Sequence, residues 1–167
     1  MKKIFQVLNK VEDAVASSLL IITSLLVFVQ VILRYKFNYS ISWSEEVSRM
    51  MIAWFIFIGS SMAVKDNAHV NMDALFSIIS GRAKILVGMI VDIINIIFCI
   101  IIIIAGINML KNAMAIGSMA TSVKVPLYIP YASVPVGVFL MLIRYIINFK
   151  NKFNDLIRFN DIKREVK

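Results

Sequence analysis

Four long runs of apolar residues, separated by charged segments, constrain this chain more than any other feature of its sequence. The runs cover residues 14–33, 47–64, 85–110 and 127–147. A bilayer core is about 30 Å thick, and a helix of about 20 apolar residues crosses it. Hydrophobic residues make up 60% of the 167 residues and charged residues only 17%, which lies outside the usual composition of soluble domains. We therefore predict an all-α membrane protein, a single membrane domain over 1–167 with four transmembrane helices.

The distribution of basic residues predicts how these helices are oriented. Glu12 and Asp13 directly precede the first run, and its small residues come before the apolar core, so we expect a retained helix and not a cleaved signal peptide. Of the 18 Lys and Arg residues, 13 fall in the N-terminal segment, the middle connection and the tail. Because basic residues collect on the cytoplasmic side, both termini are predicted to be cytoplasmic.

Three shorter segments have an apolar stripe at helical spacing, over residues 3–12, 71–80 and 149–158. Such stripes are typical of amphipathic helices that lie in the membrane interface. These interfacial helices either anchor the chain ends at the lipid headgroups or brace a partner protein in the membrane plane. The net charge of +8 is dispersed over loops and tail, which favours contact with anionic lipids and not with nucleic acid.

Residue types that catalysis, haem binding and metal binding depend on are scarce in this chain. The chain has one histidine, His69, and one cysteine, Cys99, too few for a bis-histidine haem, a disulfide or a zinc site. Asp73 follows His69 by four residues and could share its helix face, where a local hydrogen bond is the favoured interpretation over a metal site. We therefore expect no catalytic, cofactor or metal site in this chain.

Asp92 is the one acid deep within an apolar run. An isolated carboxylate in a bilayer is costly unless it is paired, protonated or hydrated. It could serve as a proton or ion site, as an autonomous transporter would need. It could also make a structural contact with a basic neighbour, with Asn95 or with a partner subunit. The structural interpretation is favoured because Asp92 lies near the predicted cytoplasmic boundary.

Glu45, Glu46 and Arg49 crowd the start of the second run. The spacing i, i+4 and i, i+3 allows both acids to pair with Arg49 on one helix, and acids suit a helix N-terminus. Two acids for one base also leave a surplus that could receive a Lys or Arg from a partner. Both interpretations stay open.

Other residues in the second run, and Trp43 just before it, indicate how this helix packs. Trp43 fits an aromatic belt at the membrane surface, whereas Trp54 lies in mid-membrane and is expected to pack between helices. Gly59 and Ala63 form a small-x-x-x-small pair, which permits close approach of two helices.

These residues together resemble the signature of the small membrane subunit of tripartite ATP-independent periplasmic (TRAP) transporters. The resemblance rests on Trp43-x-Glu45-Glu46-x-x-Arg49, followed by Trp54, Gly59, Ala63, His69 and Asp73. The Arg34-Tyr35 exit from the first run and the proline-bearing segment 125–130 also fit. One departure is Tyr131, near a position where such proteins often carry Trp.

The resemblance implies an accessory subunit in a bacterial inner membrane, and not an enzyme. In that family a large elevator-type subunit carries the substrate and sodium sites, and a periplasmic binding protein delivers an organic acid such as sialic acid or a C4-dicarboxylate. The small subunit braces the large one and holds no cofactor of its own. The alternative is an autonomous small four-helix transporter that works through Asp92.

Overall fold

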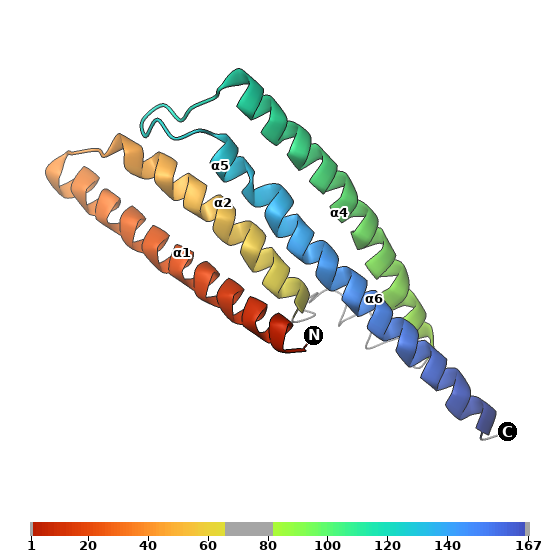
Figure 1. Ribbon diagram of the computed structural model, residues 1–167. Helices are drawn as coiled ribbons and strands as arrows, with labels where there is room; N and C mark the ends of the chain where they lie inside the picture. The colour runs from red at the N-terminus through yellow and green to blue at the C-terminus, as the bar shows by residue number, and fades with distance from the viewer. Residues whose placement is uncertain (1, 66–81, 166–167) are drawn as a thin grey trace.

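The computed structural model describes residues 2–65 and 82–165, and most of these described residues are helical. The helices are α1 (Lys2–Phe37), α2 (Ser42–Lys65), α4 (Arg82–Ile116), α5 (Tyr128–Tyr131) and α6 (Ser133–Glu165) (Figure 1). Four stretches are long and apolar enough to cross a membrane: Val7–Phe37, Ser42–Val64, Ala83–Ile116 and Tyr128–Ile157. The predicted all-α architecture with four membrane-spanning helices is confirmed.

Two of the three predicted interfacial helices are not separate elements. Residues 3–12 belong to the same helix as the first span, and residues 149–158 continue the fourth. No Gly or Pro stands at either junction, so nothing in the local sequence ends the helix where the apolar run ends. The fourth span is interrupted instead near its start, at Ala132, between α5 and α6. The predicted interfacial helix 71–80 lies outside the described residues.

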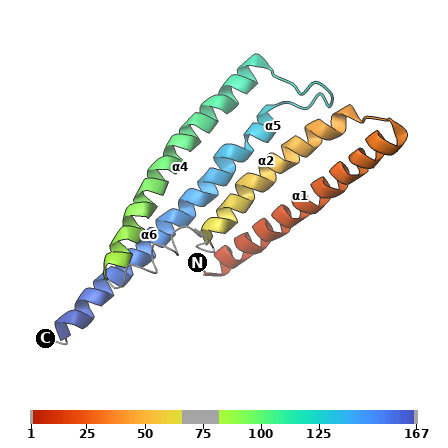
Figure 2. The same cartoon turned by 180° about the vertical axis from the view of Figure 1, so that it is seen from behind.

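The four long helices lie side by side in one layer and do not close into a bundle. Their order across the layer is α1, α2, α6 and α4, and each packs mainly on its neighbours in that order (Figures 1 and 2). The two chain ends lie at one end of the layer, and segments 38–41 and 117–127 lie at the other. We call the end with segments 38–41 and 117–127 the outer end and the end with the two chain termini the inner end, following the charge-based prediction of orientation.

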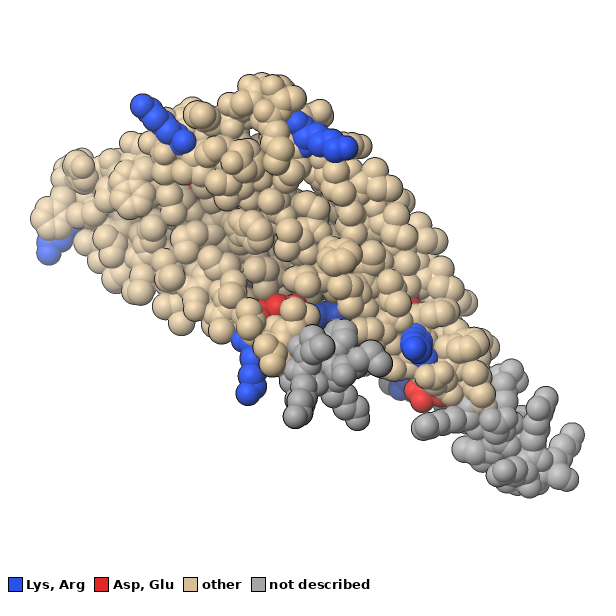
Figure 3. Space-filling view, in the orientation of Figure 1, with Lys and Arg blue, Asp and Glu red and all other residues tan. Residues whose placement is uncertain are grey.

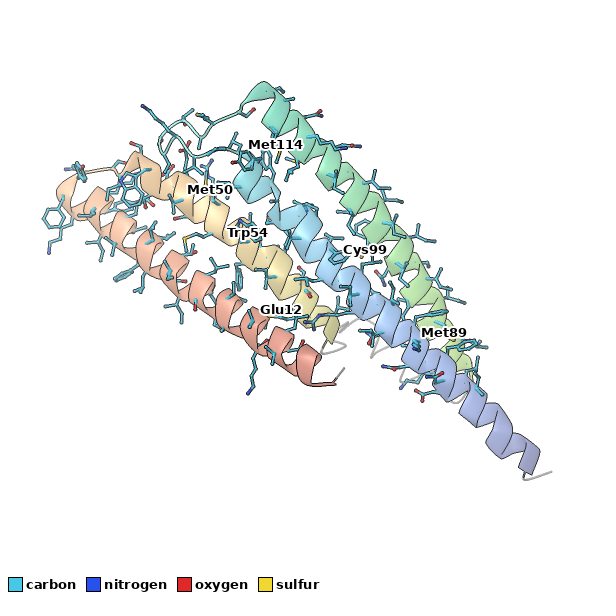
Figure 4. The ribbon with its side chains drawn as sticks, viewed as in Figure 1. Glu12, Met50, Trp54, Met89, Cys99 and Met114 are labelled. Atoms are coloured by element: carbon cyan, nitrogen blue, oxygen red, sulfur yellow. The ribbon has the colours of Figure 1, made fainter. Side chains whose placement is uncertain are left out.

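A single layer has little interior, so most apolar side chains lie on its two broad faces. The core cluster consists of only Val64, Cys99, Val138 and Tyr145, with partly buried neighbours around it; Cys99 lies between α4 and α6 (Figure 4). On the face seen in Figure 3, charged side chains gather toward the two ends of the layer and leave an uncharged band between them. This pattern matches the hydrocarbon zone of a bilayer.

Close helix approach within the chain occurs at Gly137 and not at Gly59. A Cβ atom added to Gly137 would lie 2.5 Å from Phe57 Cβ and 2.8 Å from the Phe57 carbonyl oxygen. Only a residue without a Cβ lets α6 pack so tightly on α2. At Gly59, no described atom lies within 4 Å of the corresponding position, so its small surface is not used for contacts among the described helices.

These two glycines give a matched test of the packing. Gly137→Ala forces Cβ into the Phe57 backbone and should destabilise the protein by about 1–3 kcal/mol, the usual cost of overpacking. Gly59→Ala adds a Cβ in open space and should be neutral or stabilising by up to about 1 kcal/mol, since alanine favours the helix. Thermal unfolding of the purified protein in detergent measures both; equal midpoints for the two variants would contradict the described α2–α6 contact.

Candidate functional site

Glu46 on α2 binds the outer loop of its own chain. Its Oε1 accepts hydrogen bonds from the Thr121 hydroxyl at 2.6 Å and the Thr121 amide at 3.0 Å. Its Oε2 accepts from the amides of Ser122 at 2.8 Å and Val123 at 3.2 Å. One carboxylate thus binds four donors from a segment 75 or more residues away. The sequence interpretations considered Arg49 or a partner's base, and neither identified this loop.

The loop that Glu46 binds is itself a short hairpin. Met119 and Pro126 form an isolated antiparallel bridge, with the Ala120 amide bonded to the Val125 carbonyl at 2.8 Å and the Leu127 amide to the Ser118 carbonyl at 2.9 Å. Because the turn is closed by its own backbone and fixed to α2 by Glu46, the entry to α5 and α6 is held beside α2. Farther along α2, its contact with α6 is the close packing of Phe57 on Gly137.

Glu45 faces the other neighbour of α2, which is α1. Its Oε2 lies 4.0 Å from Arg49 Nη2, so the predicted i, i+4 pair forms, and its Oε1 lies 3.8 Å from Arg34 Nη1. Gln30, buried on α1, donates to Glu45 at 3.2 Å and accepts from the Ser44 hydroxyl at 3.0 Å. The charged pairs are exposed and individually weak, whereas the Gln30 bonds lie between the helices and fix their register.

Asp92 on α4 pairs with a basic residue of α6. Lys152 Nζ lies 2.7 Å from Asp92 Oδ2 and donates to the Gly88 carbonyl at 3.2 Å. The Asp92 side chain is 5% exposed. Among the structural contacts considered from the sequence, the basic neighbour is the one that forms, while Asn95 donates to the Val91 carbonyl of its own helix at 2.9 Å.

A second buried pair, between α1 and α6, was missed in the sequence analysis. Arg144 Nη2 donates to Glu12 Oε2 and, at 3.0 Å, to Asn9 Oδ1. The side chains of Glu12 and Arg144 are 6% and 8% exposed. Figure 4 marks Glu12 on α1 near the inner end of the layer. The sequence signal for this pair was an acid just before the first apolar run and a base near the end of the fourth, both on the predicted cytoplasmic side.

The remaining predicted residues of the described chain lie along α2, from its outer to its inner end. Trp43 is half exposed, as an aromatic belt requires, and Trp54 is partly buried. Ala63 is exposed. His69 and Asp73 lie outside the described residues. Over residues 2–65 and 82–165, no three His, Cys, Asp or Glu side chains gather where they could hold a metal ion.

A groove of about 400 Å³ opens at the outer end between α2 and the loop–α5–α6 segment. Its walls are mostly apolar, with Glu46 and Arg49 as its charged members; they are formed by Glu46, Arg49, Met50, Ala53, Phe57, Ala120, Leu127, Pro130, Tyr131, Ser133 and Val134. Since Glu46 is bound to the loop and Arg49 pairs with Glu45, the groove is mainly a hydrophobic recess with charged residues at its edge.

Comparisons with known proteins agree on one family. Residues 23–155 match the family described as tripartite ATP-independent periplasmic transporters, DctQ component. The chain is 34% identical over 103 residues to a small permease protein assigned to a TRAP transporter in Haemophilus influenzae; the match covers 62% of this chain and 64% of that relative. It is 26% identical over 166 residues to the C4-dicarboxylate TRAP transporter small permease protein of Vibrio cholerae, covering 86% and 72%.

A third relative is much longer. The sialic acid TRAP transporter permease protein of Haemophilus influenzae is 26% identical over 151 residues, a match that covers 86% of this chain but 24% of the relative. This chain therefore spans less than two thirds of the Haemophilus small permease and about a quarter of the sialic acid permease.

The Glu46 contact predicts a loop whose order depends on one side chain. Glu46→Ala should raise amide hydrogen exchange of residues 118–125 severalfold, because it removes four hydrogen bonds that hold this loop to α2. Glu45→Ala is the matched control and should leave exchange in the loop unchanged. An unchanged loop in the Glu46 variant would contradict the contact.

The buried pair of Glu12 and Arg144 predicts a large loss of stability when Arg144 alone is replaced and a smaller loss when both residues are replaced. Arg144→Met leaves the buried Glu12 carboxylate without this guanidinium and should lower the free energy of unfolding by about 3–5 kcal/mol. Adding Glu12→Leu should recover much of that loss, since no buried charge is left uncompensated. Thermal unfolding in detergent gives both values; purely additive losses in the double variant would refute the coupling.

Proposed function

The chain belongs to the DctQ component family of tripartite ATP-independent periplasmic transporters, and we propose that it braces the large membrane subunit of such a transporter without binding the solute. As a member of that family it is a transporter component and not an enzyme. It is a multi-pass protein of a bacterial inner membrane, in agreement with its four membrane-spanning helices.

The observation that carries the bracing role is the use of polar side chains inside the layer. Glu46 holds the outer loop to α2, Asp92 holds α6 to α4, and Arg144 holds α6 to α1. These contacts join elements across the layer at both of its ends. They favour a stationary scaffold over a moving part, because sliding of one helix past another would break these contacts, and the pairs of Glu12 and Asp92 are buried.

The autonomous-transporter alternative depends on Asp92, and the geometry weighs against it. The carboxylate lies 2.7 Å from Lys152 Nζ and is almost entirely buried. A site that loads and releases an ion needs a carboxylate that the ion can reach from water. Asp92 in this arrangement serves instead as the acidic half of an interhelical pair.

The longer relatives support the proposed partner. The matched region is 24% of the sialic acid permease protein and 16% of the isethionate TRAP transporter permease protein of Oleidesulfovibrio alaskensis. A region like this chain is therefore covalently joined to a much larger remainder in those proteins. We propose that here a separate large subunit supplies that part, including the sodium and solute sites, and that a periplasmic binding protein delivers a carboxylated solute to the outer end.

Reconstitution in liposomes tests the division of labour. This chain alone should take up no solute above protein-free vesicles, while the complete set of both membrane subunits and the binding protein should show uptake that requires a sodium gradient. Asp92→Asn should preserve that uptake in proportion to the amount of complex assembled, since the residue is structural. Solute uptake by this chain alone, abolished by Asp92→Asn, would overturn the proposal.

A further inference from the structure

Two arginines at the outer end carry guanidinium groups that form no hydrogen bond with any residue the structure describes. Arg34 of α1 and Arg49 of α2 share one carboxylate, that of Glu45, at 3.8 and 4.0 Å. Both distances exceed the length of a hydrogen bond, and neither arginine has another polar contact within residues 2–65 and 82–165. Their side chains are 63% and 80% exposed. Two positive charges against one negative charge leave this cluster able to bind a further anion.

Both arginines line a groove of about 360 Å³ between α1 and α2, which we call the arginine groove. Val27 and Val31 of α1 also line it. They precede Arg34 at i, i+4, i+7 spacing, so the three side chains share one face of α1. Seven residues of helix span about 10 Å. The arginine groove thus runs from two cations at the outer end to an apolar wall deeper in the membrane.

The two guanidinium groups lie at the level of the lipid headgroups. Aromatic side chains that are at least half exposed gather at the same end, as they do at a membrane–water interface: Tyr35, Phe37, Tyr39 and Trp43. Arg34 directly precedes the first of these aromatics. The backbone of Arg49 lies about 9 Å further inward than that of Trp43, but its long side chain reaches back outward to Glu45.

The shape and charge of the arginine groove fit a phospholipid better than a protein segment. A guanidinium group binds phosphate through paired N–H donors, and the phosphates of a bilayer lie at this depth. The apolar wall continues inward from the cations, as the acyl chain continues inward from the phosphate. A helix is about 10 Å across, so 10 Å of its length occupies about 800 Å³. That is about twice the volume of the groove, whereas an extended hydrocarbon chain is much thinner.

We propose that the arginine groove binds one anionic phospholipid, whose phosphate bridges Arg34 and Arg49 and whose acyl chain lies along Val31 and Val27. The Glu45 carboxylate holds the two arginines near each other and competes with the phosphate for them. An anionic headgroup complements the surplus positive charge, and a zwitterionic headgroup does so less well because it brings a cation of its own. The lipid joins α1 to α2 at the outer end, where the two helices share only exposed ion pairs and the bonds of Gln30.

Native mass spectrometry of the purified chain in a mild detergent tests the proposal. With phosphatidylglycerol added, the native chain should retain one lipid, and it should retain less of an equal amount of phosphatidylcholine. Arg34→Gln and Arg49→Gln should each weaken phosphatidylglycerol binding about tenfold, since each removes a charge-assisted hydrogen bond. Lys36→Gln removes an exposed cation of the same end that does not line the groove, and it should bind like the native chain. Equal binding by all three variants overturns the lipid site.

Glu45→Gln keeps the test independent of folding defects. Glutamine retains an acceptor for Gln30 but removes the competing anion, so this variant should bind phosphatidylglycerol severalfold more tightly than the native chain. A damaged fold would weaken binding instead, and unchanged or weaker binding contradicts the proposal.

Two further measurements distinguish the lipid from other anions. Inorganic phosphate at the same concentration should not displace phosphatidylglycerol, because it has no apolar tail to fill the arginine groove; displacement would assign the arginines to free phosphate and overturn the lipid site. Arg49→Gln should leave co-purification of the large subunit unchanged in membranes that contain both. Loss of the large subunit with unchanged lipid retention would assign the arginines to a protein partner and likewise overturn the proposal.

Discussion

A bilayer accepts a charged side chain only where another group neutralises or hydrogen-bonds it, and this requirement determines how the helices of this protein are held. Glu46 and Glu12 accept hydrogen bonds from distant segments of the chain, and Asp92 forms an ion pair with Lys152 of α6. The Glu46 contact holds the outer loop against α2. The pair of Glu12 and Arg144 then joins α1 to α6 at the inner end. Without these bonds, apolar packing alone would discriminate poorly between helix orders, because lipid chains are as apolar as the helices.

The resulting layer explains why this protein suits a supporting role. A closed four-helix bundle hides its best packing surface inside, whereas an open layer offers two broad faces and two edges to its surroundings. The exposed large apolar side chains are mainly isoleucine, valine, phenylalanine and leucine, which lipid can cover.

Sequence reasoning recovered the parts of the fold that local chemistry controls. The four spans follow from uninterrupted apolar runs, and the Glu45–Arg49 pair follows from helical spacing. The separate interfacial helices at 3–12 and 149–158 did not appear, because a change from apolar to amphipathic side chains does not end a helix when no breaker residue intervenes. The close approach expected at Gly59 lies at Gly137 within this chain, because a small residue permits contact but the partner surface decides whether it occurs.

Composition, hydropathy and the motif around Trp43 by themselves determined that this is a four-span membrane protein of the TRAP small-subunit type. They identified Asp92 and Glu46 as notable acids, since charge in a hydrophobic stretch is visible in any sequence. Only the tertiary structure decided where those acids bind: Asp92 to Lys152, 60 positions along the chain, and Glu46 to a loop 75 positions away. The physical reason is that hydrophobicity is a property of each segment, whereas the choice of a hydrogen-bonding partner depends on which segments the fold brings together.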